Sequence, residues 1–426
     1  MTDLFVLIIY LSFFVFGLTR PYIAFAGYIW VDIIGPQFIT YGFMSGRPLS
    51  MVMAMLCIVS IVLNFNKLSK PKGAAVPILI VLFALWVTLT TYYAYFPTPA
   101  WYKWDVSIKT LIMSFLLLFV VNSKKQLEFI IITFSLSIGY FVMIAGMKSA
   151  AGGGGYGARL ISSSGNSGLS ESSTLAMVAV LLIPFVLFLK NHTLLFSHLK
   201  RYWYMWNLSV LVVVASVIGT TARTGLIALS AYVAIYIMRT KNKLRNITIV
   251  ALTVYLSFSF FVTDEWTQRM DTLQEVQTEG SAMGRIMVWR WTIDFVKENP
   301  MGGGFGSFRA NGGEWQLYND PPYSGTNFKA YHSVYFEVLG EHGYAGLCLF
   351  LMLIAVTFLN NNKIYKDKTT SVEDPWFHTL ALTLNHCLII FCVAGAFIGV
   401  AFQPVIYSLI AFSALLRKIW YKQYYA

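Results

Sequence analysis

The sequence predicts an all-α polytopic membrane protein, and three observations carry this prediction. Hydrophobic residues make up 57% of the 426 residues and charged residues only 12%, whereas a soluble domain carries about 25% charged residues. Apolar runs of about 18 residues, each able to cross about 30 Å of hydrocarbon, recur along the chain without the alternation of barrel strands. Lysine and arginine collect in short loops, so the net charge of +12 indicates membrane sorting rather than nucleic-acid binding.

The apolar segments follow one another in a regular order. They cover residues 4–18, 22–43, 49–65, 75–95, 106–121, 127–147, 174–189, 203–219, 225–238, 247–262, 334–358, 376–398 and 403–416. From residue 49 onward, strongly basic loops alternate with poorly basic ones, and the longest poorly basic loop covers residues 263–331. By the positive-inside rule the basic loops are cytoplasmic and this long loop lies outside.

The first two segments allow two interpretations. Gly35-Pro36 breaks the second segment, so the pair is either two spans or one broken span, which makes the total 13 or 12. Arg20 favours an N-terminus on the outer side, and Asp3 carries little weight in that rule. Because Asp3 stands where a signal peptide has a basic start, and no small-residue cleavage site follows, we expect no cleavable signal.

The segments divide the chain into four regions. Residues 1–150 form N-terminal transmembrane helices and 151–262 central ones. The external loop with the candidate site is 263–332, and 333–426 form the C-terminal helices and a cytoplasmic tail. The glycine- and serine-rich loop 148–173 reads either as a flexible connector or as a border of the external site, with Arg159 as its charge.

An amphipathic helix is predicted inside the external loop. Ser281 is a suitable N-cap, and Asn299-Pro300 ends the helix because a residue before proline disfavours helical geometry. Its apolar face is predicted to include four residues at helical spacing: Ile286, Trp289, Ile293 and Val296. Such a face suits a helix that lies on the outer leaflet or on the helix bundle.

Three arginines are candidate anion ligands. Arg223 lies between two spans joined by a very short turn, so it must lie near the outer membrane boundary, where a charge is costly and is a functional candidate. Arg285 and Arg290 project about 140° apart on the predicted helix, so one can face a site while the other faces water or headgroups. The guanidinium fork matches phosphate oxygens. The alternative is that these arginines are interfacial anchors or exposed ion-pair partners.

Glycines and one histidine complete the candidate set. Residues 302–306, including Gly304, permit close backbone approach and could offer N–H groups to an anion, although glycine-rich turns after helices are common. His332 opens the next span, where the helix dipole favours the neutral imidazole that a general base requires; a capping histidine is the alternative. All four cysteines lie in apolar runs, and no ligand cluster predicts a metal.

These motifs and their order resemble the O-antigen ligase and polymerase superfamily. The resemblance, over residues 158–416, rests on Arg223 after a short outer turn and on Gly284-Arg285-x-x-x-Trp289. It rests also on Pro300-x-Gly302 with Gly304 and Gly306, and on His332-Ser333 followed by Glu341-x-Gly343-x-x-Gly346. The N-terminal third is similar to the exosortase-associated O-glycosylation ligases of that superfamily.

The resemblance implies about 12 spans in the bacterial inner membrane, with both termini inside and the large loop in the periplasm. It implies metal-independent, cofactor-free transfer of a glycan from an undecaprenyl-pyrophosphate donor to lipid A–core, to another glycan or to a protein hydroxyl. By position, Arg223 and Arg285 would hold the pyrophosphate and His332 would take the acceptor proton, with Arg290, Arg159 and Gly304 as secondary candidates. Displacement by one activated hydroxyl predicts inversion at the anomeric carbon.

One departure and two rival functions remain. The family usually shows an asparagine where this chain has Glu171-Ser172-Ser173-Thr174, which puts the role of loop 159–176 in doubt. A lipid-linked glycan transporter would need ionisable residues spread through the spans, whereas the candidates here gather at the outer boundary. A membrane scaffold would leave Arg223, Arg285 and His332 unexplained. Ligase and polymerase activities are not separated by these residues.

Overall fold

The computed structural model describes residues 2–71, 73, 75–152, 169, 171–220, 222–239, 242–248, 251–252, 255, 280–318, 327–367 and 374–425. Within these residues the regular structure is entirely helical. The first helices are α1 (Thr2–Thr19), α2 (Pro21–Ile34), α3 (Pro36–Ile39), α4 (Leu49–Leu63), α5 (Ala75–Tyr92), α6 (Pro97–Val120), α7 (Lys124–Gly152), α8 (Ser172–His192), α9 (Trp203–Gly219) and α10 (Arg223–Arg239). They are followed by α13 (Gly280–Glu298), α14 (Val334–Lys366), α16 (Pro375–Gly395) and α17 (Pro404–Tyr424).

Several of these helices have the length and apolar composition of membrane spans. In the described part of the chain they are Ala75–Tyr92, Lys124–Lys148, Ser172–His192, Val334–Lys366 and Pro375–Gly395. Shorter apolar helices are Asp3–Thr19, Pro21–Ile34, Leu49–Leu63 and Trp203–Gly219. The protein is therefore an all-helical, multi-pass membrane protein, as predicted. The count of about 12 spans stays a prediction.

The first two apolar segments are two separate helices that run in opposite directions. At the start of α1, the Asp3 carboxylate accepts hydrogen bonds from the N–H groups of Gly42 (3.2 Å) and Met44 (3.1 Å), just beyond α3. At its other end, the Leu18 carbonyl accepts from Asn64 Nδ2 (2.8 Å), after α4. Gly35 adopts the left-handed conformation (φ 58°) and ends α2 before Pro36. The two segments are thus separate helices, and whether they form two spans or one broken span stays a prediction.

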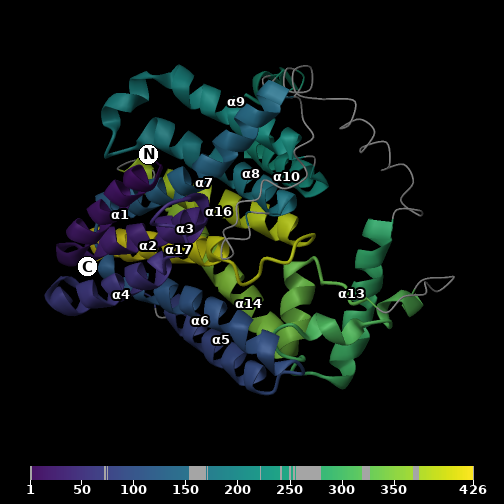
Figure 1. The fold of residues 1–426 in the computed structure, drawn as a ribbon. Helices are drawn as coiled ribbons and strands as arrows, with labels where there is room; N and C mark the ends of the chain where they lie inside the picture. The colour runs from purple at the N-terminus through teal and green to yellow at the C-terminus, as the bar shows by residue number, and fades with distance from the viewer. Residues whose placement is uncertain are drawn as a thin grey trace.

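The C-terminal helices form the centre of the bundle. Helix α17 packs against α6, α7, α14 and α16, and nearly every residue from Pro404 to Trp420 is buried. Figure 1 shows α16 and α17 in the middle of the molecule, with α5 and α6 on one side and α7 to α10 on another. The reason is chemical: α17 carries apolar residues on all sides, such as Phe412, whose ring contacts Phe134 (centroids 5.4 Å apart).

The predicted cytoplasmic loops and the predicted external loops lie at opposite ends of the helix bundle. Lys418 donates to the carbonyls of Ser69 (3.0 Å) and Leu118 (2.8 Å), and Lys124 pairs with Asp374, so these predicted cytoplasmic segments meet at one end. At the other end, the Tyr95 N–H donates to the Gly303 carbonyl (2.9 Å) and joins the α5–α6 turn to the external loop. The orientation of these ends in a membrane stays a prediction.

Helix α13 confirms the predicted amphipathic helix, but its buried face differs from the predicted one. Ile286 and Ile293 are exposed, while the buried stripe contains Met287, Val288, Trp291, Thr292 and Val296. Trp291 stacks on Phe295 (centroids 4.8 Å apart). The predicted face was right for Trp289 and Val296 and wrong for Ile286 and Ile293, because Trp291 and Val288 instead pack with Tyr331 in a small cluster under the external loop. Helix α13 packs against the 3₁₀ turn Trp315–Tyr318 and against α14.

Candidate functional site

His332 lies in a backbone conformation that few residues adopt. It directly precedes Ser333, the N-cap of α14, and its φ of 48° is in the left-handed region. Such a conformation costs about 1–3 kcal/mol in a non-glycine residue and persists only where its surroundings impose it. Two hydrogen bonds hold the preceding residue, Tyr331, in place. Trp289 Nε1 donates to the Tyr331 carbonyl (2.8 Å), and the Tyr331 hydroxyl bonds Ser307 Oγ (2.8 Å).

Trp289 also connects His332 to the body of the protein. Its ring stacks on Phe336 in α14, with centroids 5.0 Å apart and planes 3° from parallel. Phe336 is one helical turn beyond His332, so the same tryptophan holds the backbone before the histidine and the helix after it. The Gly284-Arg285-x-x-x-Trp289 stretch therefore positions the candidate base through its tryptophan.

The charges around His332 favour its neutral form. Burial lowers the pKa of His332 below its ordinary value, and the positive charges of Arg285 and Lys329 lower it further. Glu337, one turn into α14, acts in the opposite direction. The net result is an imidazole that carries a free lone pair at neutral pH, which is the state a general base needs.

Lys329 was not among the predicted residues, and its side chain lies against α13. Its ammonium lies directly over Gly284, where a Cβ would be only 2.0 Å from Lys329 Nζ. The same ammonium is 5.0 Å from the centre of the Trp315 ring. Burial, followed by the charge of Arg285, lowers the pKa of Lys329. The external loop thus brings two cations close to one histidine.

Glu171, before α8, interacts electrostatically with Arg285 of this group. It is the first residue of the stretch 171–174, where the sequence departs from the family pattern, and it is the N-cap of α8. The surrounding protein raises the pKa of Glu171, while the Thr174 hydroxyl and the Arg285 guanidinium oppose the rise. Thr174 Oγ1 donates to its carboxylate at 3.5 Å. The start of α8 therefore borders Arg285, although the loop before it lies largely outside the described residues.

The other predicted arginines take different places. Arg223 is the first residue of α10 and is half-buried. Two residues later, Gly225 packs closely against α8: a Cβ added at Gly225 would lie 2.6 Å from the Cβ of Ala176. The start of α10, with Arg223, therefore lies beside the start of α8. Arg290 is exposed, in agreement with its projection away from Arg285. Arg159 lies outside the described residues.

The glycine run is structural rather than an open anion cradle. The N–H of Gly303 donates to the Gly340 carbonyl (3.0 Å) and that of Gly304 to the Glu341 carbonyl (2.8 Å). Gly304 has a φ of 75°, and a Cβ there would lie 2.4 Å from the Cβ of Ala94. The prediction that Gly304 offers its N–H to an anion is therefore corrected: protein acceptors already use it, and the glycine is needed for close packing.

A buried ion cluster behind the histidine was missed by sequence reasoning. Lys103, near the N-terminus of α6, reaches Glu337 (Oε1, 2.7 Å) and both oxygens of Glu341 (2.8 Å each). Glu341 also accepts the Gly306 N–H (2.9 Å), and Glu337 accepts the Ala401 N–H (3.0 Å). The sequence does show a lysine at the start of one predicted span and two glutamates four residues apart in another. It does not show that these spans are neighbours, so the ion pairs could not be predicted.

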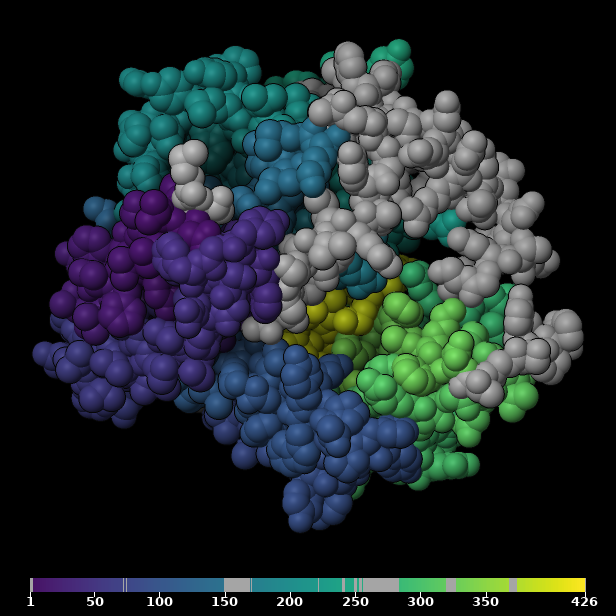
Figure 2. Space-filling model, viewed as in Figure 1, coloured from purple at the N-terminus to yellow at the C-terminus, as the bar shows by residue number. Residues whose placement is uncertain are grey.

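An open cavity of about 760 Å³ adjoins this cluster. Its walls come from the start of α6, the 306–309 turn and the 399–403 loop, and include Lys103, Arg309, Glu337 and Gln403. Gly399 lies on the wall of this cavity, close to His332. A Cβ added at Gly399 would lie 3.5 Å from Glu337 Oε2 and 4.0 Å from the backbone nitrogen of His332. Figure 2 shows C-terminal residues, in yellow, within a hollow between the blue α5–α6 residues and the green external loop. The volume suits a small-molecule site.

The sequence comparisons agree with this arrangement. Residues 208–351, which include Arg223, Arg285 and His332, match the family described as O-Antigen ligase. Residues 1–194 match a family of unknown function (DUF5935). The comparison with curated proteins gives no match. Among the described residues, no group of three or more histidine, cysteine, aspartate or glutamate residues is arranged to hold a metal ion. The O-antigen ligase match supports membership of the O-antigen ligase and polymerase superfamily for this part of the chain.

Proposed function

We propose that the protein transfers a glycan from an undecaprenyl-pyrophosphate carrier to an acceptor hydroxyl at the periplasmic face of the bacterial inner membrane. The superfamily suggests membrane glycosyl transfer of ligase or polymerase type. The observation that carries the finer proposal is the group formed by Arg285, Lys329 and His332, in which burial, and then the two cations, lower the pKa of the histidine. One end of this group suits a pyrophosphate and the other a proton acceptor.

The reaction follows from the charges. His332 takes the proton of the acceptor hydroxyl as its oxygen bonds to the anomeric carbon of the donor sugar. The bond from that carbon to the pyrophosphate oxygen breaks on the opposite face, so the configuration inverts. Arg285, with Arg223 at the start of α10, stabilises the negative charge that grows on the pyrophosphate, and fixed cations do this best in a poorly hydrated site. The protonated His332 then loses its proton to water.

The proposal is tested with purified protein, a lipid-linked glycan and separate candidate acceptors: lipid A–core, a second lipid-linked glycan and a protein substrate. A lipid A–core or protein product identifies a ligase, and an extended lipid-linked glycan identifies a polymerase. Movement of the lipid-linked glycan between leaflets without a covalent product identifies a transporter and refutes the proposal. A protein acceptor is the outcome that the similarity to exosortase-associated ligases favours.

Donor binding and turnover should be separable. His332→Ala should keep donor affinity but slow transfer by roughly 10²–10⁴-fold, the usual scale for loss of a general base. Arg285→Lys and Arg223→Lys should weaken donor binding, because lysine keeps the charge but loses the bidentate fork. His198→Ala, at an exposed histidine in a predicted cytoplasmic loop, is the matched control. Wild-type turnover in His332→Ala would remove the proposed base.

A further inference from the structure

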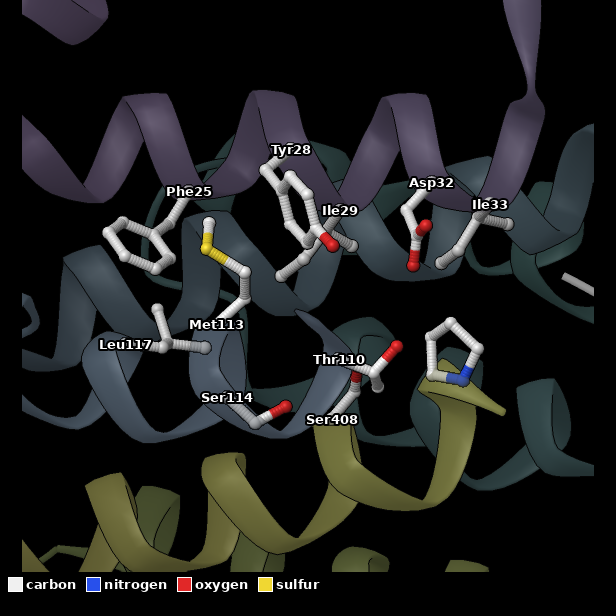
Figure 3. Close-up of a pocket in the computed structure, with 11 residues that line it drawn as sticks. Phe25, Tyr28, Ile29, Asp32, Ile33, Thr110, Met113, Ser114, Leu117 and Ser408 are labelled. Carbon is white, nitrogen blue, oxygen red and sulfur yellow. The ribbon is translucent and has the colours of Figure 1, made fainter. Parts of the chain in front are cut away.

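A second polar site lies in the N-terminal half, in the region that matches a family of unknown function. Asp32 is in the last turn of α2, three residues before the break at Gly35, and only 7% of its surface is exposed. Figure 3 shows its carboxyl group directed into a small cavity between α2, α6 and α17. The last turn of a helix carries partial negative charge, so a buried carboxylate at this position is doubly unfavourable without a positive partner.

The walls of this cavity are mostly apolar but include several oxygen-bearing side chains. Besides Asp32 it is lined by the hydroxyl-bearing residues Tyr28, Thr110, Ser114 and Ser408, and its other lining residues are apolar. Thr110 donates within its own helix, to the Val106 carbonyl (3.2 Å). In the described part of the chain, no hydrogen bond is made by the Asp32 carboxyl group or by the hydroxyls of Tyr28, Ser114 and Ser408. Four polar groups therefore face one small space without satisfying one another.

The size of the cavity limits what can satisfy them. Its volume is about 30 Å³, and one water-sized particle needs roughly 10–15 Å³, so one or two such particles fit. An unpaired carboxylate inside a membrane protein is expensive and normally marks a proton or ion site. A divalent ion usually takes more than one charged oxygen ligand, and Asp32 is the only carboxylate in the lining. A small monovalent cation matches both the single charge and the neutral oxygens.

We propose that this cavity binds one Na⁺ ion between the Asp32 carboxylate and the surrounding hydroxyls, with room for one water. The broken helix supports this assignment, because discontinuous membrane helices direct their C-terminal ends at bound Na⁺ in other proteins. The bound ion would join α2 to α6 and α17 and so fasten the N-terminal helices to the centre of the bundle. The site is separate from the proposed glycosyl-transfer site.

The small cavity lies close to the large one. Thr110 is about one helical turn beyond Val106 and Ser107 on α6, and these two residues line the large outer cavity. On α17, Pro404 lines the small cavity and its neighbour Gln403 the large one. The small cavity therefore lies next to the inner wall of the large one, and Na⁺ would reach Asp32 from the outer end.

The test uses the full chain in detergent micelles or nanodiscs. Thermal unfolding is followed by tryptophan fluorescence in NaCl and in choline chloride, at one pH and one ionic strength. Because a ligand that binds only the folded state stabilises it with the logarithm of its concentration, the midpoint should rise steadily with Na⁺. Binding of ²²Na⁺ should saturate at one ion per chain. Asp32→Asn should remove both responses.

Further variants keep the test decisive if Asp32→Asn does not fold. Ser408→Ala should fold and need a several-fold higher Na⁺ concentration for the same stabilisation. Ser137→Ala should respond as wild type, because this buried hydroxyl donates within its own helix, to the Thr133 carbonyl (2.7 Å). Equal wild-type midpoints in Na⁺ and choline, with no ²²Na⁺ bound, would overturn the proposal. A midpoint that depends on pH only, and loses this dependence in Asp32→Asn, would show a protonated carboxyl instead.

Discussion

Replacing Lys103 by methionine should destabilise the protein strongly. The ammonium of Lys103 contacts two carboxylates, at 2.7 Å from Glu337 and 2.8 Å from Glu341, whose side chains are only 9% and 1% exposed. Without it, two like charges one helical turn apart remain buried. Each would then keep one backbone donor: the N–H of Ala401 for Glu337 and the N–H of Gly306 for Glu341.

The magnitude follows from this burial. Removing one partner of a buried ion pair costs about 3–5 kcal/mol, because the remaining charge has lost both water and its counter-charge. Lys109 provides a control on the same helix: its ion pair with Asp105 joins side chains that are 62% and 55% exposed. Exposed i,i+4 pairs contribute only about 0.3–0.5 kcal/mol, so Lys109→Met should unfold almost as wild type does.

The assay is equilibrium unfolding in mixed micelles of increasing SDS content, followed by tryptophan fluorescence. The double variant Lys103→Met/Glu341→Gln should recover part of the loss, because it removes one of the stranded charges. Contacting residues in one network couple by about 0.5–3 kcal/mol. The reasoning is refuted if Lys103→Met unfolds at the same SDS fraction as Lys109→Met, or if the double variant is no more stable than the single one.

Three further outcomes are expected. Because burial and two cations lower the pKa of His332, the transfer rate should stay constant from neutral pH upward and decline only below the ordinary pKa of histidine. Arg285→Ala should move this decline to higher pH. An unchanged pH–rate profile in this variant would contradict the electrostatic argument. Impermeant thiol reagents applied to intact spheroplasts of variants without native cysteines should label Lys297→Cys but not Lys366→Cys, and the reverse pattern would invert the proposed topology. Transfer should persist in EDTA, and activity that disappears in chelator and returns with Mg²⁺ would show that the arginines do not stabilise the pyrophosphate alone.

The apolar and polar parts of the chain, and the elements of the candidate site, could be read from local sequence. Composition over about 20 residues decides whether a helix can cross a membrane, and the amphipathic helix follows from helical spacing and from a proline that ends it. The motifs around Arg285 and His332 likewise lie within short stretches. Local reasoning was weaker where packing decides exposure: Ile286 and Ile293 are exposed on α13, and Gly304 supports packing instead of binding.

The remaining features depend on contacts between residues far apart in the chain. Lys103 and Glu337 are 234 positions apart, and they pair because α5 and α6 pack beside α14 and α17. The approach of Glu171 to Arg285, the cover of Lys329 over Gly284 and the cavity at Asp32 likewise depend on which helices become neighbours. Membrane helices of similar composition can pack in many orders, since each is apolar enough to face either lipid or protein. Small residues that allow close approach, such as Gly225 against Ala176, and buried charges that need partners select one order among them.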